Sequence, residues 1–277
     1  MKIAANTWIW ISPFSPKIIK KVKALGFDGI EIPVENPAGM NTTLIKKALQ
    51  SHGLSCSSIS ATLSPGRDLI SPDGKVRENT KKYIMRCIEI ARDLDSEIVQ
   101  GPMYSTTGKL ETRLPREKEW KYCIKGLREL GRFAEDYGVY LTIEPLNRFK
   151  SYFINTTEDA VKIIKEVNNP NVKINLDTFH MNIEEKSISK AISLAGELLY
   201  HVHVIENDRG AVGTGSINWK EFRDALLEID YTHWLAIESF NPKIKSLAKA
   251  SSTWKQAEVD QDSLARKSLM FLRQLFR

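Results

Sequence analysis

The sequence has few of the features that mark several common protein classes. It contains only three cysteines among 277 residues, and Cys56, Cys87 and Cys123 form no CxxC or CxxH pattern. This excludes a disulfide framework or a zinc ribbon and predicts buried free thiols. No apolar run approaches the roughly 20 residues of a membrane span. Because polar Asn6 interrupts the first apolar residues, no signal-peptide pattern is present, and we expect a cytoplasmic protein.

The chain also lacks a concentrated basic surface, although its formal net charge is +6 and its pI is about 9.0. Lysine and arginine are spread through amphipathic stretches such as 17–23 and 113–125, where acids or apolar residues separate most of them. A nucleic-acid-binding stripe would gather these cations with aromatic residues. We therefore expect solvated helix surfaces, with neither nucleic acid nor membrane as a partner.

Short apolar segments alternate with longer amphipathic ones along the whole chain. The pattern predicts eight strands, at 3–9, 29–33, 54–62, 97–102, 140–144, 172–177, 200–205 and 233–240. It also predicts eight helices, at 16–25, 43–52, 77–94, 115–137, 157–167, 188–195, 219–229 and 261–275.

A repeat of one strand and one helix every 35 residues or so is typical of a parallel sheet with helical crossovers. Eight such units predict an α/β protein with the closed (β/α)8 architecture of a TIM barrel, and residues 1–277 as one domain. A doubly wound open sheet is the alternative. No GxGxxG or Walker lysine motif follows the first strand to support it.

Four chemically active residues lie at the ends of four successive predicted strands. Glu144, Asp177, His203 and Glu238 are separated by 33, 26 and 35 residues, about one strand-helix unit each. Because the carboxyl ends of barrel strands meet at one mouth, we expect these side chains to converge there. Three crowded carboxylates repel one another strongly unless a cation lies among them.

The donor types predict which ion this would be. Carboxylate oxygens with one imidazole suit Mn²⁺, Mg²⁺ or Co²⁺ better than a structural zinc. Four protein ligands leave an ion that favours six-coordination two positions for water or substrate. His201 shares the strand parity of His203 but lies farther from the strand end, so we expect His203 to be the ligand and His201 to be core.

Several long segments resemble those of the ketose 3-epimerases, the D-tagatose and D-psicose 3-epimerase family of xylose-isomerase-like barrels. The similar segments are IEPLNRF at 143–149, LDTFHMNIEE at 176–185, HVHVIENDRG at 201–210, GTG at 213–215, IESF at 237–240 and GPMY at 101–104. The resemblance implies a divalent metal, commonly Mn²⁺, bound by Glu144, Asp177, His203 and Glu238. It further implies that Glu144 and Glu238 act as the acid/base pair and that His180 and Arg209 hold substrate oxygens. The family commonly forms homodimers or homotetramers.

The residue types suit inversion at carbon 3 of a ketohexose or related keto-sugar. Such inversion needs proton removal beside a carbonyl, a metal-stabilised enediolate, and proton return to the other face. Two carboxylates flanking a sugar supply both transfers. Asn6 and Trp8, expected on one face of the first strand, are further candidates for substrate contact, although strand aromatics are as often packing. We expect His180 to lie in a loop.

Lys150 departs from the family pattern, which usually has a second glutamate at this position. A three-donor cation in place of an acceptor changes what the pocket favours there. Lys150 could pair with Glu184 or Glu185, donate to the same substrate hydroxyl, or indicate another substrate, such as an acidic or phosphorylated sugar or a 3-oxo-glycoside.

Other reactions on the same site are an aldose-ketose isomerase and a 3-oxo-glycoside epimerase or lyase. A remote alternative is an abasic-site DNA endonuclease, which some similar barrels are. Such an enzyme needs a histidine-rich cluster of several zinc ions. Only five histidines are present in the whole chain, and three of them lie near the predicted mouth, which disfavours this reading.

Overall fold

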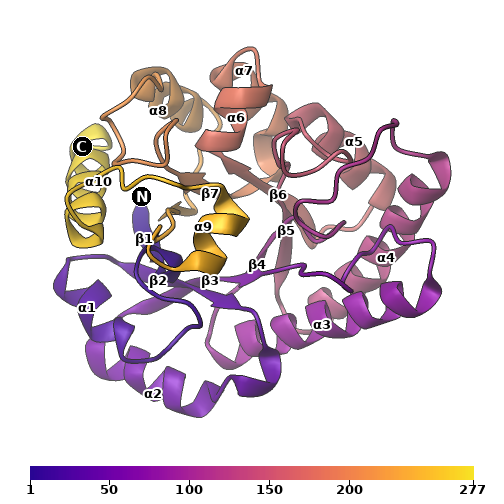
Figure 1. Ribbon diagram of the computed structural model, residues 1–277, viewed down its shortest axis with the longest axis horizontal. Helices are drawn as coiled ribbons and strands as arrows, with labels where there is room; N and C mark the ends of the chain where they lie inside the picture. The colour runs from indigo at the N-terminus through magenta and orange to yellow at the C-terminus, as the bar shows by residue number, and fades with distance from the viewer.

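Eight parallel strands close into a barrel in the computed structural model, which describes residues 1–277 (Figure 1). Each strand pairs with the next, and β8 pairs back with β1, where Ala4 lies opposite Ala236. The predicted (β/α)8 architecture is therefore confirmed. The strands are β1 (Lys2–Asn6), β2 (Gly29–Val34), β3 (Ser55–Ala61), β4 (Ile98–Gly101), β5 (Tyr140–Ile143), β6 (Val172–Asp177), β7 (Leu199–Val204) and β8 (Trp234–Ile237).

Most helices form a ring outside the strands (Figure 1). All eight expected helices are present: α1 (Ile18–Ala24), α2 (Thr42–His52), α3 (Gly74–Asp93), α4 (Glu117–Asp136), α5 (Thr157–Val167), α7 (Ile188–Ala195), α8 (Trp219–Glu228) and α10 (Gln261–Leu275). Two more, α6 (Thr178–Glu184) and α9 (Lys245–Ser251), were not expected from the sequence. Three short 3₁₀ turns complete the chain, η1 (Thr7–Ile9), η2 (Pro37–Gly39) and η3 (Gly196–Leu198).

Local chemistry explains several of these boundaries. Helix α5 begins with a capping box, in which the Thr156 side chain accepts from the Asp159 N–H at 3.2 Å and the Asp159 carboxylate accepts from the Thr156 N–H at 3.1 Å. Helix α2 ends at Gly53, whose φ of 58° is left-handed. At the end of β4, a side chain on Gly101 would lie 2.6 Å from the Ala61 carbonyl oxygen. Only glycine fits at this edge of the barrel mouth.

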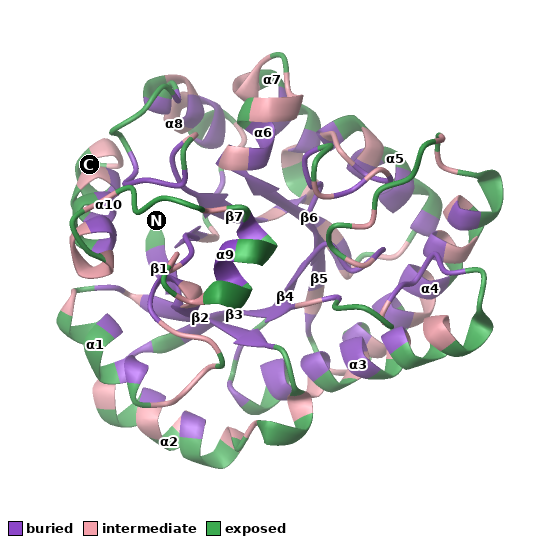
Figure 2. Cartoon of the chain, in the orientation of Figure 1, coloured by how far each residue is buried: buried purple, intermediate pink, exposed green.

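A single cluster of 69 buried apolar residues fills the space around the strands. The strands are almost entirely buried, while the helices alternate buried and exposed faces (Figure 2). This is the pattern of amphipathic helices packed on a parallel sheet, and burial of apolar area is the main stabilising contribution.

A set of buried polar residues interrupts the apolar packing of the strands. Barrel interiors are usually filled with branched apolar side chains, so these residues are an exception. They hydrogen-bond to one another; Gln100 donates to Ser60 and accepts from Asn175 at 3.3 Å, for example. We call this set the polar layer: Asn6, Glu31, Ser58, Ser60, Gln100, Asn175, His201 and His203.

Two details differ from the sequence expectations. His180 lies in helix α6 rather than in a loop. Strand β1 ends at Asn6, so Trp8 lies in η1 and does not share a strand face with it. Both differences arise where short elements follow a strand, because a turn or two of helix contains too few residues to show a periodic pattern.

The three cysteines are buried and unpaired, as expected. None of the helices combines the length and the apolar character needed to cross a membrane.

Candidate active site at the barrel mouth

The four predicted metal ligands converge at the carboxyl ends of β5 to β8. Glu144 and Glu238 come directly after β5 and β8, Asp177 is the last residue of β6, and His203 is the fifth of the six residues of β7. One donor atom from each lies within 4.8 Å of the others, and all four residues are buried. Strand geometry alone therefore gathers residues that are up to 94 positions apart in sequence.

His203 and Arg209 connect the three carboxylates. His203 Nδ1 lies 3.0 Å from Glu144 Oε1 and 3.8 Å from Glu238 Oε1. Arg209 Nη1 lies 3.0 Å from Asp177 Oδ2 and 3.4 Å from Glu238 Oε2. The Arg209 guanidinium also lies 4.0 Å from the Phe179 ring and 5.1 Å from the Phe240 ring, while its Nε has no partner.

The surroundings shift the carboxyl groups in different directions. Burial raises the pKa of Glu144, and burial with the nearby Glu144 raises the pKa of Glu238 to about 8. Burial alone would also raise the pKa of Asp177, but Arg209, His180 and His203 bring it below its ordinary value. The raised pKa values of Glu144 and Glu238 mean that three negative charges are unfavourable in this buried group. A bound cation would offset that repulsion. With its oxygen-rich donor set, the group fits a divalent metal ion.

His180 presents one defined nitrogen to the site. Its Nδ1 accepts from the backbone N–H of Asn147 at 3.1 Å, so the ring hydrogen is on Nε2. Nε2 lies 3.6 Å from Asp177 Oδ2. Burial lowers the pKa of His180 to about 3, which makes the ring neutral at physiological pH. The ring is a neutral hydrogen-bond donor at the mouth.

A cavity of about 250 Å³ opens directly above these residues. It is smaller than the ~300–1,000 Å³ typical of pockets for drug-sized ligands, which suits a monosaccharide. The residues that define its chemistry are Trp8, Gln100, Glu144, Lys150, His180, Arg209, Glu238, Phe240 and, from α9, Ser246, Leu247, Ala250 and Ser251.

Trp8 and Asn6 take different places in this arrangement. Trp8 lines the cavity and stacks on Phe240 with ring centroids 5.5 Å apart. Asn6 is fully buried, does not line the cavity, and donates to Glu31 Oε1 at 2.6 Å and to Glu238 Oε1 at 3.4 Å. The structure thus brings Trp8 to the cavity wall and Asn6 to the polar layer behind the acids.

Lys150 lines the cavity, but its partners are neither Glu184 nor Glu185, the two acids considered in the sequence analysis. Its Nζ donates to the Ala250 carbonyl oxygen at 2.7 Å and to Ser252 Oγ at 2.8 Å. The Glu184 carboxylate is bound by Arg148, and Glu185 accepts from the Thr157 N–H at 2.7 Å. The pairing of Lys150 with Glu184 or Glu185 is therefore wrong.

The sequence reasoning missed Glu31, the centre of the polar layer. It is fully buried in β2, with His201 Nε2 at 2.8 Å and His203 Nε2 at 3.1 Å. Burial would raise the pKa of Glu31, yet the two imidazoles lower it well below its ordinary value. The signal was a single carboxylate within the apolar run Gly-Ile-Glu-Ile-Pro-Val.

Comparison with known proteins agrees with this geometry. Residues 19–275 match the model of the xylose isomerase-like TIM barrel family. The L-ribulose 3-epimerase of Methylomonas sp. (strain DH-1) is 30% identical over 96% of this chain and 93% of its own length. The D-psicose 3-epimerase of Ruminiclostridium cellulolyticum is 35% identical over 80% and 77% of the two chains.

A solved structure extends the likeness to three dimensions. The crystal structure of the D-allulose 3-epimerase from Methylomonas sp. in complex with D-allulose matches with a TM-score of 0.93 and 28% identity, covering 99% of this chain and 96% of that one. The chain belongs to the ketose 3-epimerases, carbohydrate isomerases of the xylose isomerase-like TIM-barrel family.

Proposed function

We propose that the chain inverts carbon 3 of a ketohexose or a related ketose, with Glu144 and Glu238 as the two proton-transfer groups. The supporting observation is that both carboxylates line one small cavity and are held within 4.8 Å of Asp177 and His203. All 277 residues would act as one catalytic domain.

The proposed metal is Mn²⁺, with Mg²⁺ or Co²⁺ as alternatives, bound by Glu144, Asp177, His203 and Glu238. When bound, the ion supplies positive charge that stabilises the oxygens of an enediolate. The donor set favours one such ion per chain. Two or three ions per chain, measured by elemental analysis, would instead support the multi-zinc endonuclease reading.

The two glutamates perform the inversion by a proton relay. One carboxylate removes the carbon 3 proton from one face, and the electron pair forms the double bond between carbons 2 and 3 as the carbonyl oxygen becomes negative. The other carboxyl group, protonated, then returns a proton to the opposite face. Which glutamate acts as base depends on the configuration of the sugar.

Two further side chains orient the sugar. The Nε2–H of His180 and the unpaired Nε–H of Arg209 would donate to oxygens near the carbonyl. The stacked rings of Trp8 and Phe240 would pack against the apolar face of the sugar. Asn6, in contrast, would act on Glu31 and Glu238 rather than on the substrate.

Product analysis tests this assignment. Chelator-treated protein reloaded with Mn²⁺ should convert D-fructose, D-tagatose or L-ribulose to its carbon 3 epimer and should be inactive before reloading. Formation of an aldose would support the isomerase alternative. Turnover confined to a 3-oxo-glucoside would support the glycoside alternative, in which Lys150 would contact the substrate.

Assembly and location complete the proposal. We expect a homodimer or homotetramer, as the resemblance to the family implies, and a location in the cytoplasm, as the N-terminal sequence pattern suggests. Light scattering on the purified protein measures the assembly directly, and a monomer at micromolar concentration would contradict it.

A further inference from the structure

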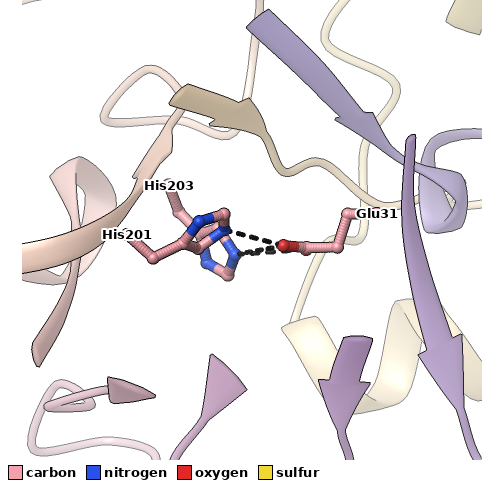
Figure 3. A group of neighbouring side chains, drawn as sticks. All are labelled: Glu31, His201 and His203. Carbon is pink, nitrogen blue, oxygen red and sulfur yellow. Dashed lines mark hydrogen bonds and ion pairs between the residues drawn. The ribbon is translucent and has the colours of Figure 1, made fainter. Parts of the chain in front are cut away.

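A buried trio lies beneath the proposed metal ligands, formed by Glu31 of β2 and by His201 and His203 of β7 (Figure 3). All three side chains are fully buried. Figure 3 shows both imidazoles directed at the single carboxylate. His201 Nε2 lies 2.8 Å from Glu31 Oε2, and His203 Nε2 lies 3.1 Å from Glu31 Oε1.

The spacing of these atoms would suit a metal ion, but the carboxylate is already saturated. Besides the two imidazoles, it accepts from Asn6 Nδ2 at 2.6 Å, Ser58 Oγ at 2.5 Å and Ser60 Oγ at 3.1 Å. A carboxylate offers about four lone-pair sites, and five donors occupy them. Glu31 is therefore an anion held by hydrogen-bond donors and does not form a second metal site.

This arrangement has a consequence for the tautomer of His203. Because the Glu31 carboxylate only accepts hydrogen bonds, the hydrogen of the neutral His203 ring belongs on Nε2. The Nδ1 lone pair then faces Glu144 Oε1 at 3.0 Å and Glu238 Oε1 at 3.8 Å, among the other proposed ligands. His201, two residues earlier on β7, approaches Glu31 from the same side and lies edge-on to the His203 ring, with centroids 5.2 Å apart (Figure 3).

We propose that Glu31 is a positioning residue for the metal centre: it fixes the tautomer and the orientation of His203 so that Nδ1 binds the ion. The inference rests on the proposed role of His203 as a ligand. Asn6, Ser58, Ser60 and His201 hold the carboxylate in place, which explains a polar layer inside a barrel that would otherwise be apolar.

The first test is the affinity for Mn²⁺, measured by calorimetric titration of the metal-free protein. Glu31→Gln leaves one acceptor oxygen for two imidazoles and turns an N–H₂ group towards other donors. Loss of a hydrogen-bond partner behind a metal ligand typically costs 10–100-fold in affinity, and we expect a rise in Kd of about that size. A Kd within about twofold of the native value would overturn the proposal.

A matched control separates a specific effect on the position of His203 from a general loss of stability. Glu206 is also a fully buried carboxylate, and it accepts from Trp219 Nε1 at 2.8 Å and from the Gly213 N–H at 3.0 Å, without contacting the trio. Glu206→Gln should lower Tm and leave the Mn²⁺ affinity unchanged. Equal loss of affinity in both variants would contradict a specific role for Glu31.

Two further variants keep the test decisive. His203→Gln should abolish tight Mn²⁺ binding; unchanged binding in this variant would refute the proposed metal centre itself rather than the role of Glu31. If Glu31→Gln does not fold, Ser58→Ala removes one of the bonds that orient Glu31 and should weaken Mn²⁺ binding severalfold. No change in Ser58→Ala would then count against the proposal.

The second test reads the tautomer directly in the native protein. Ring ¹H–¹⁵N correlation spectra of the Mg²⁺-loaded chain, with the His203 signals assigned by their loss in His203→Gln, should show hydrogen on Nε2 and none on Nδ1. Hydrogen on Nδ1 in the loaded protein would overturn the proposal.

Discussion

Lys150 Nζ donates to the carbonyl oxygen of Ala250 at 2.7 Å and so joins the segment after β5 to the last turn of α9. Residues of α9 line the cavity, and Figure 1 shows this helix in front of the barrel opening rather than in the outer ring. A lysine at a helix C-terminus satisfies free carbonyl groups and interacts favourably with the helix dipole. The contact therefore stabilises one wall of the sugar site.

Lys150→Ala should loosen this wall. A hydrogen bond to a charged group contributes about 1.5–3 kcal/mol, so we expect at least a severalfold rise in KM with a smaller change in kcat. Amide exchange in 245–251 should also become faster. Lys249→Ala, an exposed change on the same helix, is the control. Equal kinetics for native and Lys150→Ala proteins would show that the contact does not shape the site.

Metal binding should raise thermal stability. The ion would relieve repulsion among three buried carboxylates, and a ligand at 100 times its Kd stabilises by about 2.7 kcal/mol. For a chain of this size, that corresponds to a rise in Tm of roughly 5–10 °C. Calorimetry of chelator-treated protein with and without Mn²⁺ measures it. An identical Tm in both samples would contradict metal binding by the native fold.

Arg209→Lys should impair catalysis without removing the metal. Lysine keeps the charge but loses the Nε–H and the flat guanidinium that packs against Phe179. We expect kcat/KM to fall about 10–100-fold, as for one lost orienting contact, while the Kd for Mn²⁺ stays within a few-fold. The exposed Arg148, which pairs with Glu184, offers the matched control Arg148→Lys. Native activity in Arg209→Lys would refute a role in substrate orientation.

Acid stability should depend on Glu119. Hydrogen bonds from Arg113 lower the pKa of Glu119 from 4.5 to about 2. A lowered folded-state pKa adds stability that is present above the unfolded value of 4.5 and is lost as the pH falls towards 2. The difference in Tm between native protein and Glu119→Gln should therefore shrink as the pH falls from about 5 to 3. A constant difference in Tm across this range would show that protonation of Glu119 does not affect the stability of the fold.

Much of this structure was predictable from sequence patterns, because the long periodic segments and the spacing of strand-end acids are local signals. That spacing alone predicts the convergence of Glu144, Asp177, His203 and Glu238 at the barrel mouth, which the structure shows. Helices α6 and α9 have only seven residues each, which is too few to show a period. Their absence from the prediction put His180 in a loop and left Lys150 without its actual partners.

The role of Glu31 depends on a contact that the sequence does not encode locally. Its imidazole partners are 170 and 172 positions away, and a register irregularity falls between Ile30 and Glu31 in the pairing of β2 with β3. A sequence pattern identifies a carboxylate in an apolar strand. Only the closed barrel shows that two histidines face it.

Solvent deuterium is the most direct probe of the central claim that Glu144 and Glu238 invert carbon 3 by proton transfer. With Mn²⁺ and a ketose in D₂O, mass spectrometry and proton NMR should show one deuterium at carbon 3 of the epimer. Glu144→Gln and Glu238→Gln should each lower this incorporation by about 10²–10⁴-fold. Epimer formed without any deuterium at carbon 3, or formed at the native rate by either variant, would contradict the proposed chemistry.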